Sequence, residues 1–294
     1  MPSVPPSDTR GIIDPADMAR YAVLHRYPVG DGLEGLVDWF WAVSWHLPNG
    51  QTHVQQVLNH PSGHISIGTL DDAGADHEHP GARVYGLITR VSQRRLTGTG
   101  WTVAAKTTTG GLGALLGRPA RTITDTALSL HDALGLDDAP LVAQVVDQPT
   151  ETQRVDRLRA ALESTTAGRD PALLRQAREV ARVARIAETD RGVHRVEQLA
   201  RAAGVSVRTL QRLFGEFVGA SPAWVIRRWR IIEAAERAAA AVGPDGDDGQ
   251  WPGWADLAAE LGYSDQAHLS RDVRRHLGTT PSGYRARQAG RRPH

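Results

Sequence analysis

The stretch Gly204-Val-Ser-Val-Arg-Thr-Leu-Gln-Arg-Leu-Phe214 has a counterpart later in the chain, Gly262-Tyr-Ser-Asp-Gln-Ala-His-Leu-Ser-Arg271. Leu199-Ala200 precedes the first glycine as Leu257-Ala258 precedes the second, at an offset of 58 residues. Beyond the glycines the offset becomes 59, and it relates Leu210, Arg212, Gly219 and Pro222 to Leu269, Arg271, Gly278 and Pro281. Such repetition indicates two copies of one structural unit, with one residue inserted in the second.

Each copy has the pattern of a helix-turn-helix unit. Ala200 and Ala258 are small where a second helix must cross closely, and Gly204 and Gly262 tolerate the positive φ of a tight turn. Ser206 is expected to cap the second helix of the first copy. A buried stripe on that helix is predicted by apolar residues three and four apart, namely Leu210, Leu213, Phe214 and Phe217.

The opposite face of each second helix carries side chains that can read DNA bases. Arginine can bond guanine through two atoms, and glutamine can do the same with adenine. The candidate DNA-binding residues of the first copy are Ser206, Arg208, Thr209, Gln211 and Arg212. Those of the second copy are Gln266, His268, Ser270 and Arg271. A solvated polar face is the alternative for either helix alone, but its occurrence in two copies favours DNA contact.

Ser221-Pro222 predicts the start of a helix that joins the two copies and reaches about Val242. Roughly 20 helical residues span roughly 30 Å, close to the turn of B-DNA at about 34 Å. Two recognition helices on this connector could therefore enter successive major grooves. Core contacts are expected from Trp224, Trp229, Ile232 and Ala235. Either phosphate contacts or a solvated face is expected from Arg227, Arg228 and Arg230.

The two repeated segments, Gly204–Phe214 and Gly262–Arg271, resemble the AraC/XylS family of transcription regulators. The resemblance also includes Gly219-Ala-Ser-Pro222 and Gly278-Thr-Thr-Pro-Ser-Gly-Tyr-Arg285. The resemblance covers about residues 195–287 and implies an all-α DNA-binding domain of seven helices with two helix-turn-helix units. It also implies RNA polymerase as a partner if the protein is an activator. Base readout is implied for Arg208, Gln211, Arg212, Gln266, His268 and Arg271.

Two departures from the family pattern concern the second unit. Val273 stands where the family often has phenylalanine, and His276 and Leu277 stand near another usual aromatic. We therefore expect looser packing there. The acidic, glycine- and proline-rich segment 243–253 is longer than the family's usual link. It is expected to be a surface loop that points away from DNA, because its carboxylates would repel phosphates.

The earlier part of the chain is expected to be β-rich. Five short runs with β-branched and aromatic residues, punctuated by Pro, Gly, Asn and Asp, predict a barrel or sandwich: Leu36–Trp45, Thr52–Leu58, His64–Leu70, Arg83–Thr89 and Trp101–Thr107. Added helices are expected over Leu112–Leu116, Ala127–Leu134, Gln153–Glu163 and from Asp170-Pro171 to about Glu188. We place a linker at Thr165–Arg169, which divides the chain into residues 1–165 and 166–294.

Residues 1–165 resemble, loosely, a poorly characterised N-terminal domain of some actinobacterial family members. The similarity lies in Gly113-Ala-Leu-Leu-Gly117 and Thr124-Asp-Thr-Ala-Leu-Ser-Leu130. It implies a cupin-like β-barrel that senses a small molecule, dimerises, or does both.

Charge is divided unevenly between the two parts. The whole chain has 34 Lys+Arg and 33 Asp+Glu, a net charge of +1. Up to Thr150 there are 10 basic and 15 acidic residues, and beyond it 24 and 18, an asymmetry that hints at a nucleic-acid-binding part. The absence of cysteine excludes disulfides, thiolate metal sites and a cysteine nucleophile. Neither a signal peptide nor a membrane span is recognisable, so a cytoplasmic protein is expected.

The first domain offers a few further candidates. Trp39, Trp41 and Trp45 would share one strand face and could line an aromatic ligand pocket, with ordinary barrel core as the alternative. Asp76 and His77-Glu-His79 are metal-ligand types, but their surroundings favour a solvated loop. No metal or cofactor is therefore expected. Ordinary barrel positions are expected for His53, His60 and His64, an exposed position for Lys106, and no phosphate loop at Gly110–Gly113.

The sequence thus predicts a sequence-specific DNA-binding transcription regulator rather than an enzyme. Double-stranded DNA is the expected partner, and control would come through the N-terminal domain, by a small-molecule effector or by homodimerisation. The alternative is a DNA-anchored protein-interaction module without a ligand. A fused enzyme is the third hypothesis. Its known precedent, alkylation repair by cysteine alkyl transfer, needs a cysteine that this chain lacks.

Overall fold

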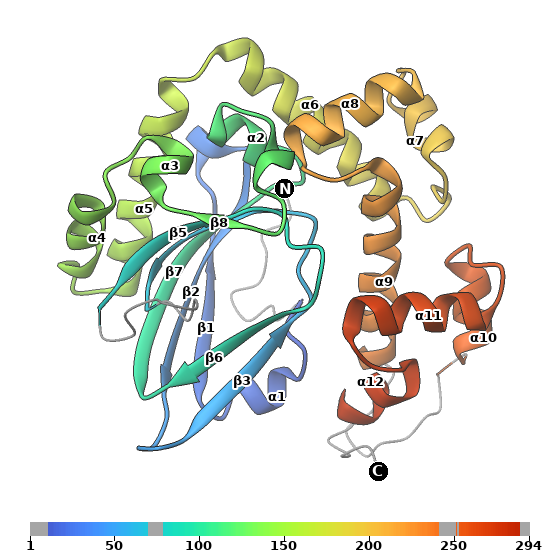
Figure 1. Cartoon of the computed structure of the whole chain (residues 1–294), viewed down its shortest axis with the longest axis horizontal. Coiled ribbons are helices and arrows are strands. Elements are labelled where there is room, and N and C mark those ends of the chain that lie inside the picture. The colour runs from blue at the N-terminus through green and yellow to red at the C-terminus, as the bar shows by residue number, and fades with distance from the viewer. Residues whose placement is uncertain (1–10, 70–78, 241–250, 252, 289–294) are drawn as a thin grey trace.

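The computed structural model describes residues 11–69, 79–240, 251 and 253–288. Its N-terminal part contains an antiparallel six-stranded sheet and a two-stranded ribbon, β3–β6, that lies across it (Figure 1). The strands of the large sheet, in spatial order, are β1 (Ala22–Tyr27), β2 (Val37–His46), β7 (Thr99–Thr107), β4 (His64–Gly68), β5 (Gly81–Tyr85) and β8 (Ala127–Leu128). The ribbon pairs β3 (Thr52–Val57) with β6 (Ser92–Thr97).

Helices cover one face of the large sheet. These helices are α3 (Leu130–Leu134), α4 (Asp138–Val146) and α5 (Glu151–Ala167). Phe40 and Ala42 of β2 point into this layer, where they join a core with Leu158 and Leu162 of α5. Alternate residues of a strand face opposite sides, so the odd-numbered Trp39, Trp41 and Trp45 lie on the other face, toward the ribbon. The remaining short elements of this part are α1 (Pro15–Met18), η1 (Asp31–Leu33), α2 (Gly111–Leu116) and η2 (Ala120–Ile123).

The C-terminal part is all-α, and the described residues form seven helices, as the family resemblance implied. These are α6 (Pro171–Thr189), α7 (Val196–Ala202), α8 (Val207–Phe217), α9 (Pro222–Ala240), α10 (Trp254–Glu260), α11 (Gln266–Leu277) and α12 (Pro281–Gln288). Both turn glycines adopt the expected positive φ, 66° at Gly204 and 76° at Gly262. The fold class predicted from the sequence, a β-rich domain followed by two helix-turn-helix units, is therefore confirmed.

The two parts share one apolar core. Leu36, Leu58 and Leu87 belong to the same buried cluster as Phe214 and Val225 of the C-terminal helices. Helix α6 packs against α2 of the N-terminal part and also against α7, α8 and α9. The expected linker, Thr165–Arg169, is largely helical, because α5 extends to Ala167 and Asp170 caps α6. The two parts are thus packed together rather than connected by a loose segment.

The glycine-rich segment 110–113 allows this close packing. A Cβ atom on Gly113 would lie 2.5 Å from the carbonyl oxygen of Glu216, and one on Gly111 would lie 1.9 Å from that of Leu36. Side chains at these positions would therefore force α2 away from α8 and from the sheet. Within the described parts of the chain, no helix is both long and apolar enough to cross a membrane.

Candidate nucleic-acid interface and ligand pocket

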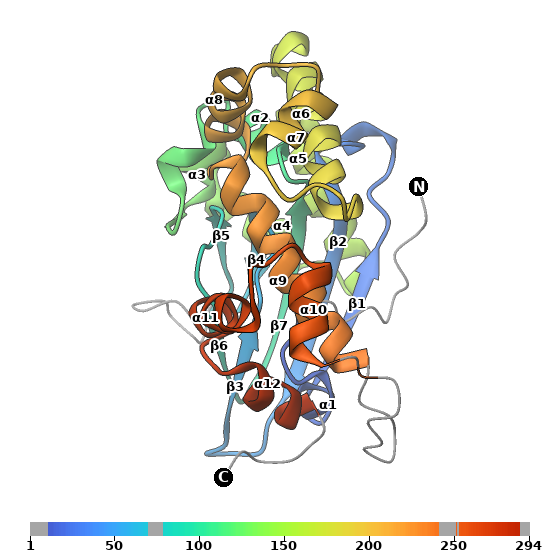
Figure 2. The same ribbon diagram turned by 90° about the vertical axis from the view of Figure 1, so that its right-hand side faces the viewer.

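The two second helices, α8 and α11, lie at different levels along α9. Both run across the view in Figure 1, and both are seen almost end-on, on the same side of α9, when the molecule is turned (Figure 2). Each begins with a capping side chain: Ser206 Oγ accepts the Thr209 backbone N–H at 3.1 Å, and Asp265 Oδ1 accepts that of His268 at 2.7 Å. Two similar helix pairs are thus presented in the same sense on one long helix.

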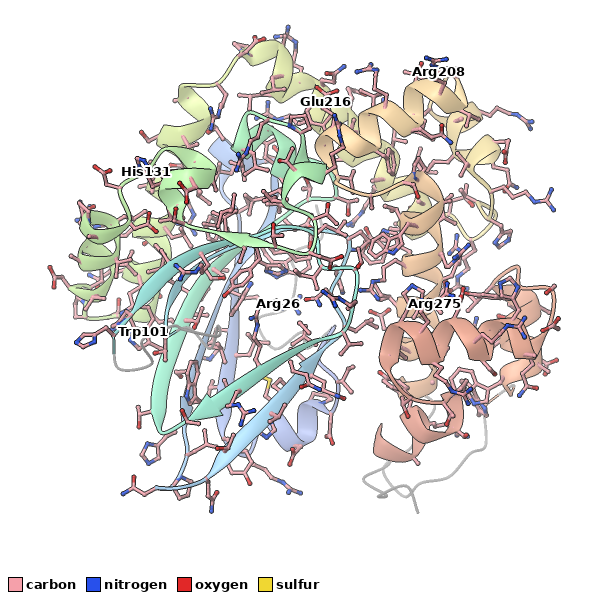
Figure 3. The ribbon with its side chains drawn as sticks, in the orientation of Figure 1. Arg26, Trp101, His131, Arg208, Glu216 and Arg275 are labelled. Atoms are coloured by element: carbon pink, nitrogen blue, oxygen red, sulfur yellow. The ribbon has the colours of Figure 1, made fainter. Side chains whose placement is uncertain are left out.

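Helix α8 presents three long polar side chains to solvent. Arg208, Gln211 and Arg212 are exposed, and Arg208 projects away from the body of the molecule in Figure 3. Arg212 Nη1 pairs with Glu216 Oε2 at 3.1 Å across one helical turn. Thr209 is half-buried and lies 2.9 Å from Ser206 through the two hydroxyl oxygens. The cap residues are therefore engaged locally, whereas the longer side chains extend outward.

Helix α11 presents a less basic face near its beginning. Gln266 and Arg271 are exposed, while His268 and Ser270 are half-buried. The ring of His268 packs edge-on against Tyr263, with centroids 5.0 Å apart, and its Nδ1 lies 3.3 Å from Ser264 Oγ. At the offset of 59 residues, Ala267 occupies the position that Arg208 has in α8. The two candidate reading faces therefore differ in charge.

The arginines of α9 correct one sequence-based hypothesis. Arg228 and Arg230 are buried, with 0% and 3% of their surfaces exposed, so neither can contact phosphate or solvent in this structure. Arg230 Nη2 donates to the Asp190 and Val193 carbonyl oxygens at 2.7 and 3.0 Å. Arg227 is exposed and its Nε lies 3.5 Å from Asp272 Oδ2. The prediction failed because a run of arginines on an amphipathic helix does not reveal which of them are covered, Arg228 by residues 88–89 of the N-terminal part and Arg230 by the segment before α7.

The apolar positions of both units lie in the core. Trp229, Ile232 and Ala235 are buried as expected, and Trp224 packs partly buried beside them. In the second unit Val273, His276 and Leu277 are all buried, in spite of the missing aromatics. Burial lowers the pKa of His276, which is therefore more readily neutral, and its Nδ1 lies 2.8 Å from the Asp272 carbonyl oxygen.

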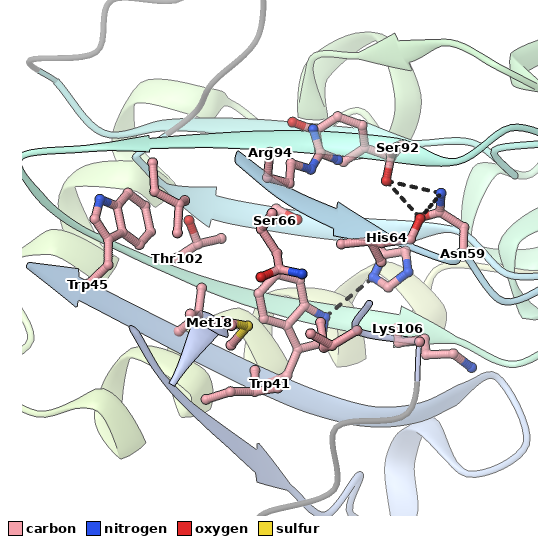
Figure 4. A pocket seen from close by; sticks show the side chains of 18 of the residues that line it. Met18, Trp41, Trp45, Asn59, His64, Ser66, Ser92, Arg94, Thr102 and Lys106 are labelled. Carbon is pink, nitrogen blue, oxygen red and sulfur yellow. Dashed lines mark hydrogen bonds between the residues drawn. The ribbon is translucent and has the colours of Figure 1, made fainter. Parts of the chain in front are cut away.

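A cavity of about 200 Å³ lies between the large sheet and the β3–β6 ribbon (Figure 4). Trp39, Trp41 and Trp45 all contribute to its wall, together with Val43 on the same strand face. Trp41 Nε1 donates to His64 Nδ1 at 3.3 Å, and Trp45 Nε1 donates to the Thr97 carbonyl oxygen at 3.2 Å. The structure therefore brings the three tryptophans together around one cavity, and ligand binding by them remains a prediction.

One end of this cavity carries cations that the sequence reasoning missed. The Arg26 Cζ and Lys106 Nζ atoms lie 4.5 and 4.3 Å from the centre of the Trp39 ring, within cation–π range. Lys106, expected to be exposed, is buried and forms an ion pair with Asp38. Burial, and then the charges of Lys106, Arg94 and Arg26, lower the pKa of His64 to about 3, so His64 is neutral near pH 7.

Strand alternation predicts which face of its strand Lys106 lies on, but only the pairing of the strands brings Lys106 beside Trp39. In the predicted run Trp101–Thr107, Lys106 is two and four residues from Ala104 and Thr102, so it faces the same side as they do. Strand β7 pairs with β2 in antiparallel register, with Lys106 opposite Trp39. Arg26 lies on β1, a strand that we did not predict, opposite Trp41. No local signal marked His60, which is buried against Trp229 with ring centroids 5.1 Å apart.

The remaining candidates do not form a metal site among the described residues. His53 stacks at a tilt on Tyr21 at 5.3 Å, and His60 and His64 line the cavity. Asp76 and His77-Glu78 lie outside the described residues, and His79 is exposed. The greater part of the acidic segment 243–253 also lies outside the described residues.

Two family models match the chain. Residues 199–287 match a helix-turn-helix domain, and residues 25–129 match a domain of unknown function, DUF6597. No curated protein matches the chain. The chain is similar to crystal structures of ToxT from Vibrio cholerae. ToxT of strain O395 is 11% identical, with a TM-score of 0.38 and coverage of 85% of this chain and 98% of that one.

Two structures of ToxT from Vibrio cholerae strain SCE256 are also similar. The wild-type protein bound to an unsaturated fatty acid is 11% identical, with a TM-score of 0.38 and coverage of 87% of this chain and 98% of that one. An apo variant is 12% identical, with a TM-score of 0.36 and coverage of 84% and 96%. From the matched domain and its paired helices, we conclude that residues 199–287 form an AraC-type helix-turn-helix domain and that the chain is a DNA-binding transcription regulator.

Proposed function

We propose that the chain binds a specific DNA site by placing α8 and α11 in successive major grooves. The observation that carries this proposal is the placement of both helices on one side of α9, in similar orientation (Figures 1 and 2). The 19 residues of α9 correspond to a rise of about 28 Å, close to one turn of B-DNA at about 34 Å. One chain could therefore span two adjacent grooves on the same face of the duplex.

Within this proposal the exposed side chains read bases. On α8, Arg208, Gln211 and Arg212 are long enough to reach groove edges, while Ser206 and Thr209 shape the helix start. On α11, Gln266 and Arg271 extend outward, with His268 and Ser270 closer to the helix surface. Arginine contacts with phosphate would supply much of the affinity and make it depend on salt, whereas base contacts would supply the specificity.

We further propose that residues 1–165 act as a sensor for residues 166–294. The cavity lined by Trp39, Trp41 and Trp45 is the effector site in this proposal, because an apolar cavity with a few convergent polar groups is the usual form of a ligand site. The shared core supports transmission between the two parts, since packed side chains join them directly. Homodimerisation and contact with RNA polymerase stay predictions.

Site selection from a random DNA pool with the full chain, followed by footprinting, tests the DNA-binding proposal. We expect protection of about 18–20 base pairs, two major grooves with their flanks. The variant Arg208→Ala with Gln211→Ala should relax selection at one half of the site, and Arg157→Ala, exposed on α5, is the matched control. Salt-sensitive binding without a selected sequence or footprint would refute specific readout and favour the DNA-anchored interaction module.

A further inference from the structure

The cavity between the sheets has two chemically different ends, and the strand register explains the difference. At one end Trp39 of β2 pairs with Lys106 of β7. On the other edge of β7, Lys106 pairs with His64 of β4. At the other end Trp45 lies opposite Ala22 and Gly100. The small neighbours accommodate the Trp45 indole, which lies directly on Gly100, whereas charged and polar neighbours surround Trp39. We call these the cationic end and the apolar end.

The lining of the cavity is rich in basic side chains. Four basic residues line the cavity, namely Arg26, Arg94, Arg95 and Lys106, and its described lining contains no aspartate or glutamate. Asp38 balances Lys106 from outside this lining. The charges of Lys106, Arg94 and Arg26 also help to lower the pKa of His64. Neutral His64 accepts the Trp41 indole proton at Nδ1, so its own ring proton is on Nε2, where it can be donated.

The apolar end is built differently. Trp45, Met18 and Leu96 are buried together with Ala22 and Leu47. The Trp45 indole N–H donates to the Thr97 carbonyl oxygen, at the end of strand β6. A molecule lying along β2 would therefore meet cations at one end and apolar side chains at the other.

We propose, extending the proposed sensor function, that the cavity binds an aromatic carboxylate of one or two rings. Its anionic group would lie beside Arg26 and Lys106, and its ring system beside Trp41, Trp45 and Leu96. The volume sets the size, since an apolar cavity of about 150 Å³ holds benzene and this one measures about 200 Å³. The cations set the charge, because burying a carboxylate is favourable only with charged or hydrogen-bonding partners.

Calorimetric titration of the full chain with 2-naphthoate and its neutral analogue 2-naphthamide tests this proposal without DNA. We expect naphthoate to bind at least about tenfold more tightly, as charged hydrogen bonds predict. Arg26→Met should remove that preference and leave naphthamide binding unchanged, while Arg90→Met, exposed and outside the cavity, should change neither. Circular dichroism and thermal melts verify that each variant is folded.

Three results would overturn the proposal: equal affinity for acid and amide, a preference that survives in Arg26→Met, or no binding of benzoate, phenylacetate or naphthoate at millimolar concentration. A double variant, Lys106→Met with Asp38→Asn, tests the second cation without leaving a buried carboxylate unpaired. Because these titrations contain no DNA, a negative result would refute the ligand proposal without affecting the DNA-binding proposal. Absence of a footprint would likewise refute specific DNA binding without affecting the ligand proposal.

A separate observation concerns the contact between the cavity wall and α9. His60, which lines the cavity, packs edge-on against Trp39 at 6.3 Å and against Trp229 of α9 at 5.1 Å between ring centroids. The Trp229 indole N–H is buried and has no hydrogen-bond acceptor among the described residues. Three rings therefore connect the cationic end of the cavity with the helix that carries both recognition helices.

The neighbouring Arg228 makes this boundary energetically unusual. Its Nη2 donates to the Ile88 and Thr89 carbonyl oxygens at 3.3 and 3.4 Å, both long, while its Nε and Nη1 have no hydrogen-bond partner among the described residues. Burial lowers the pKa of Arg228 to about 10. An incompletely bonded, buried guanidinium costs free energy, so a small displacement of α9 could improve its hydrogen bonding at little net expense.

We infer that the state of the cavity is communicated to α9 through His60 and Trp229. A shift at Trp39 would move His60 and, through it, Trp229 of α9. Helix α9 would then move where its hydrogen bonding is least complete, beside Arg228. Since α8 and α11 are joined to α9, their relative placement on DNA would change. Such coupling requires two arrangements whose balance both sites affect, and the incomplete hydrogen bonding of Arg228 supplies a reason for the second arrangement.

A ligand-free mutant cycle on DNA affinity tests this route. We expect Trp39→Phe to change the Kd for the selected DNA site by about fivefold or more, a usual size for coupling between sites. In a Trp229→Phe background the same substitution should change Kd less than twofold. Trp101→Phe, which faces the helical layer rather than the cavity, is the control. An equal effect of Trp39→Phe in both backgrounds, or no effect in either, would exclude this route.

Discussion

The two helix-turn-helix units have one motif in different structural settings. The first is built into the N-terminal part: α8 packs against α2 and η2, and Thr124 Oγ1 donates to the Gly219 carbonyl oxygen at 2.7 Å. The second packs mainly on α9 and α12, and Arg237–Glu260, at 2.6 Å, joins it to α9 from the surface. A motif that is repeated in the sequence is therefore attached to the rest of the molecule in two different ways.

Their cores differ at one equivalent position. Phe217 in the first unit corresponds to His276 in the second, at the offset of 59 residues. Both are buried. Phe217 adds only apolar contacts, whereas His276 is stable there in its neutral form and depends on a hydrogen bond to the Asp272 carbonyl oxygen. The second unit thus has the more condition-dependent core.

The largest expected effect comes from truncating each core. Phe217→Ala should cost about 3–5 kcal/mol and Leu269→Ala about 2–5 kcal/mol of unfolding free energy. Because Phe217 lies beside Gly113 of α2, its loss should also expose the N-terminal part to hydrogen exchange, while loss of Leu269 should act within α10–α12. Segment-resolved hydrogen exchange measures both. Equal exposure of α2 in the two variants would disprove the asymmetry.

Removing one arginine from each recognition helix compares how the two units use DNA. Arg212→Ala and Arg271→Ala should each cost about 1–3 kcal/mol at the selected site and relax base preference in different halves of it. Competition binding with single-base variants of the site measures this. If either variant loses affinity uniformly across all sequences, that arginine contacts phosphate rather than a base.

Gly113→Ala tests the attachment of the first unit. The added methyl group would meet the Glu216 backbone at 2.5 Å and Phe217 Cα at 2.8 Å, so we expect a loss of about 1–3 kcal/mol from overpacking. Gly168→Ala is the control, because its nearest contact would be an ordinary 3.7 Å. Chemical denaturation gives the difference. A Gly113→Ala protein as stable as the control would mean that α2 and α8 can separate freely.

The smallest effect is a pH dependence confined to the second unit. The folded pKa of His276 is lowered, so the unfolded chain binds its proton first as pH falls below about 6.5. The contribution of His276 to the free energy of unfolding is fully present above about pH 6.5. It is lost progressively as the pH falls from there to the pKa of His276 in the folded protein. The opening free energy of α11, taken from hydrogen exchange normalised to the intrinsic rate at each pH, should therefore decrease as the pH falls from 7.5 to 5.5, and His276→Phe should flatten this decrease. An unchanged slope would assign the effect to other groups.

The sequence was most informative where a pattern repeats. The paired units, the capping role of Ser206 and the start of α6 at Asp170-Pro171 were all predicted, because local spacing determines them. Strand β6, with the sequence Ser-Gln-Arg-Arg-Leu-Thr, was missed because it has almost no apolar alternation. Burial of Lys106 and Arg228 was also missed, since it depends on elements far away in the chain.

The candidate site shows the same division. Alternation along β2 correctly placed three tryptophans on one face, since a strand's period of two is a local property. The cations opposite them come from β1, β6 and β7, and only the register of those strands brings them together. Their contribution could not be derived before the pairing of Trp39 with Lys106 was known.

The close contact at Gly113 also limits how such a chain can be recombined. Regulators are often treated as interchangeable parts, in which any sensor can be fused to any reader. Here a foreign N-terminal domain would need a glycine at the place where α2 meets Glu216. It would also need apolar residues equivalent to Leu36, Leu58 and Leu87, which cover the core of the DNA-binding domain. Chimeras that exchange only residues before the linker should aggregate, and functional hybrids should retain α2 and α8 from the same parent.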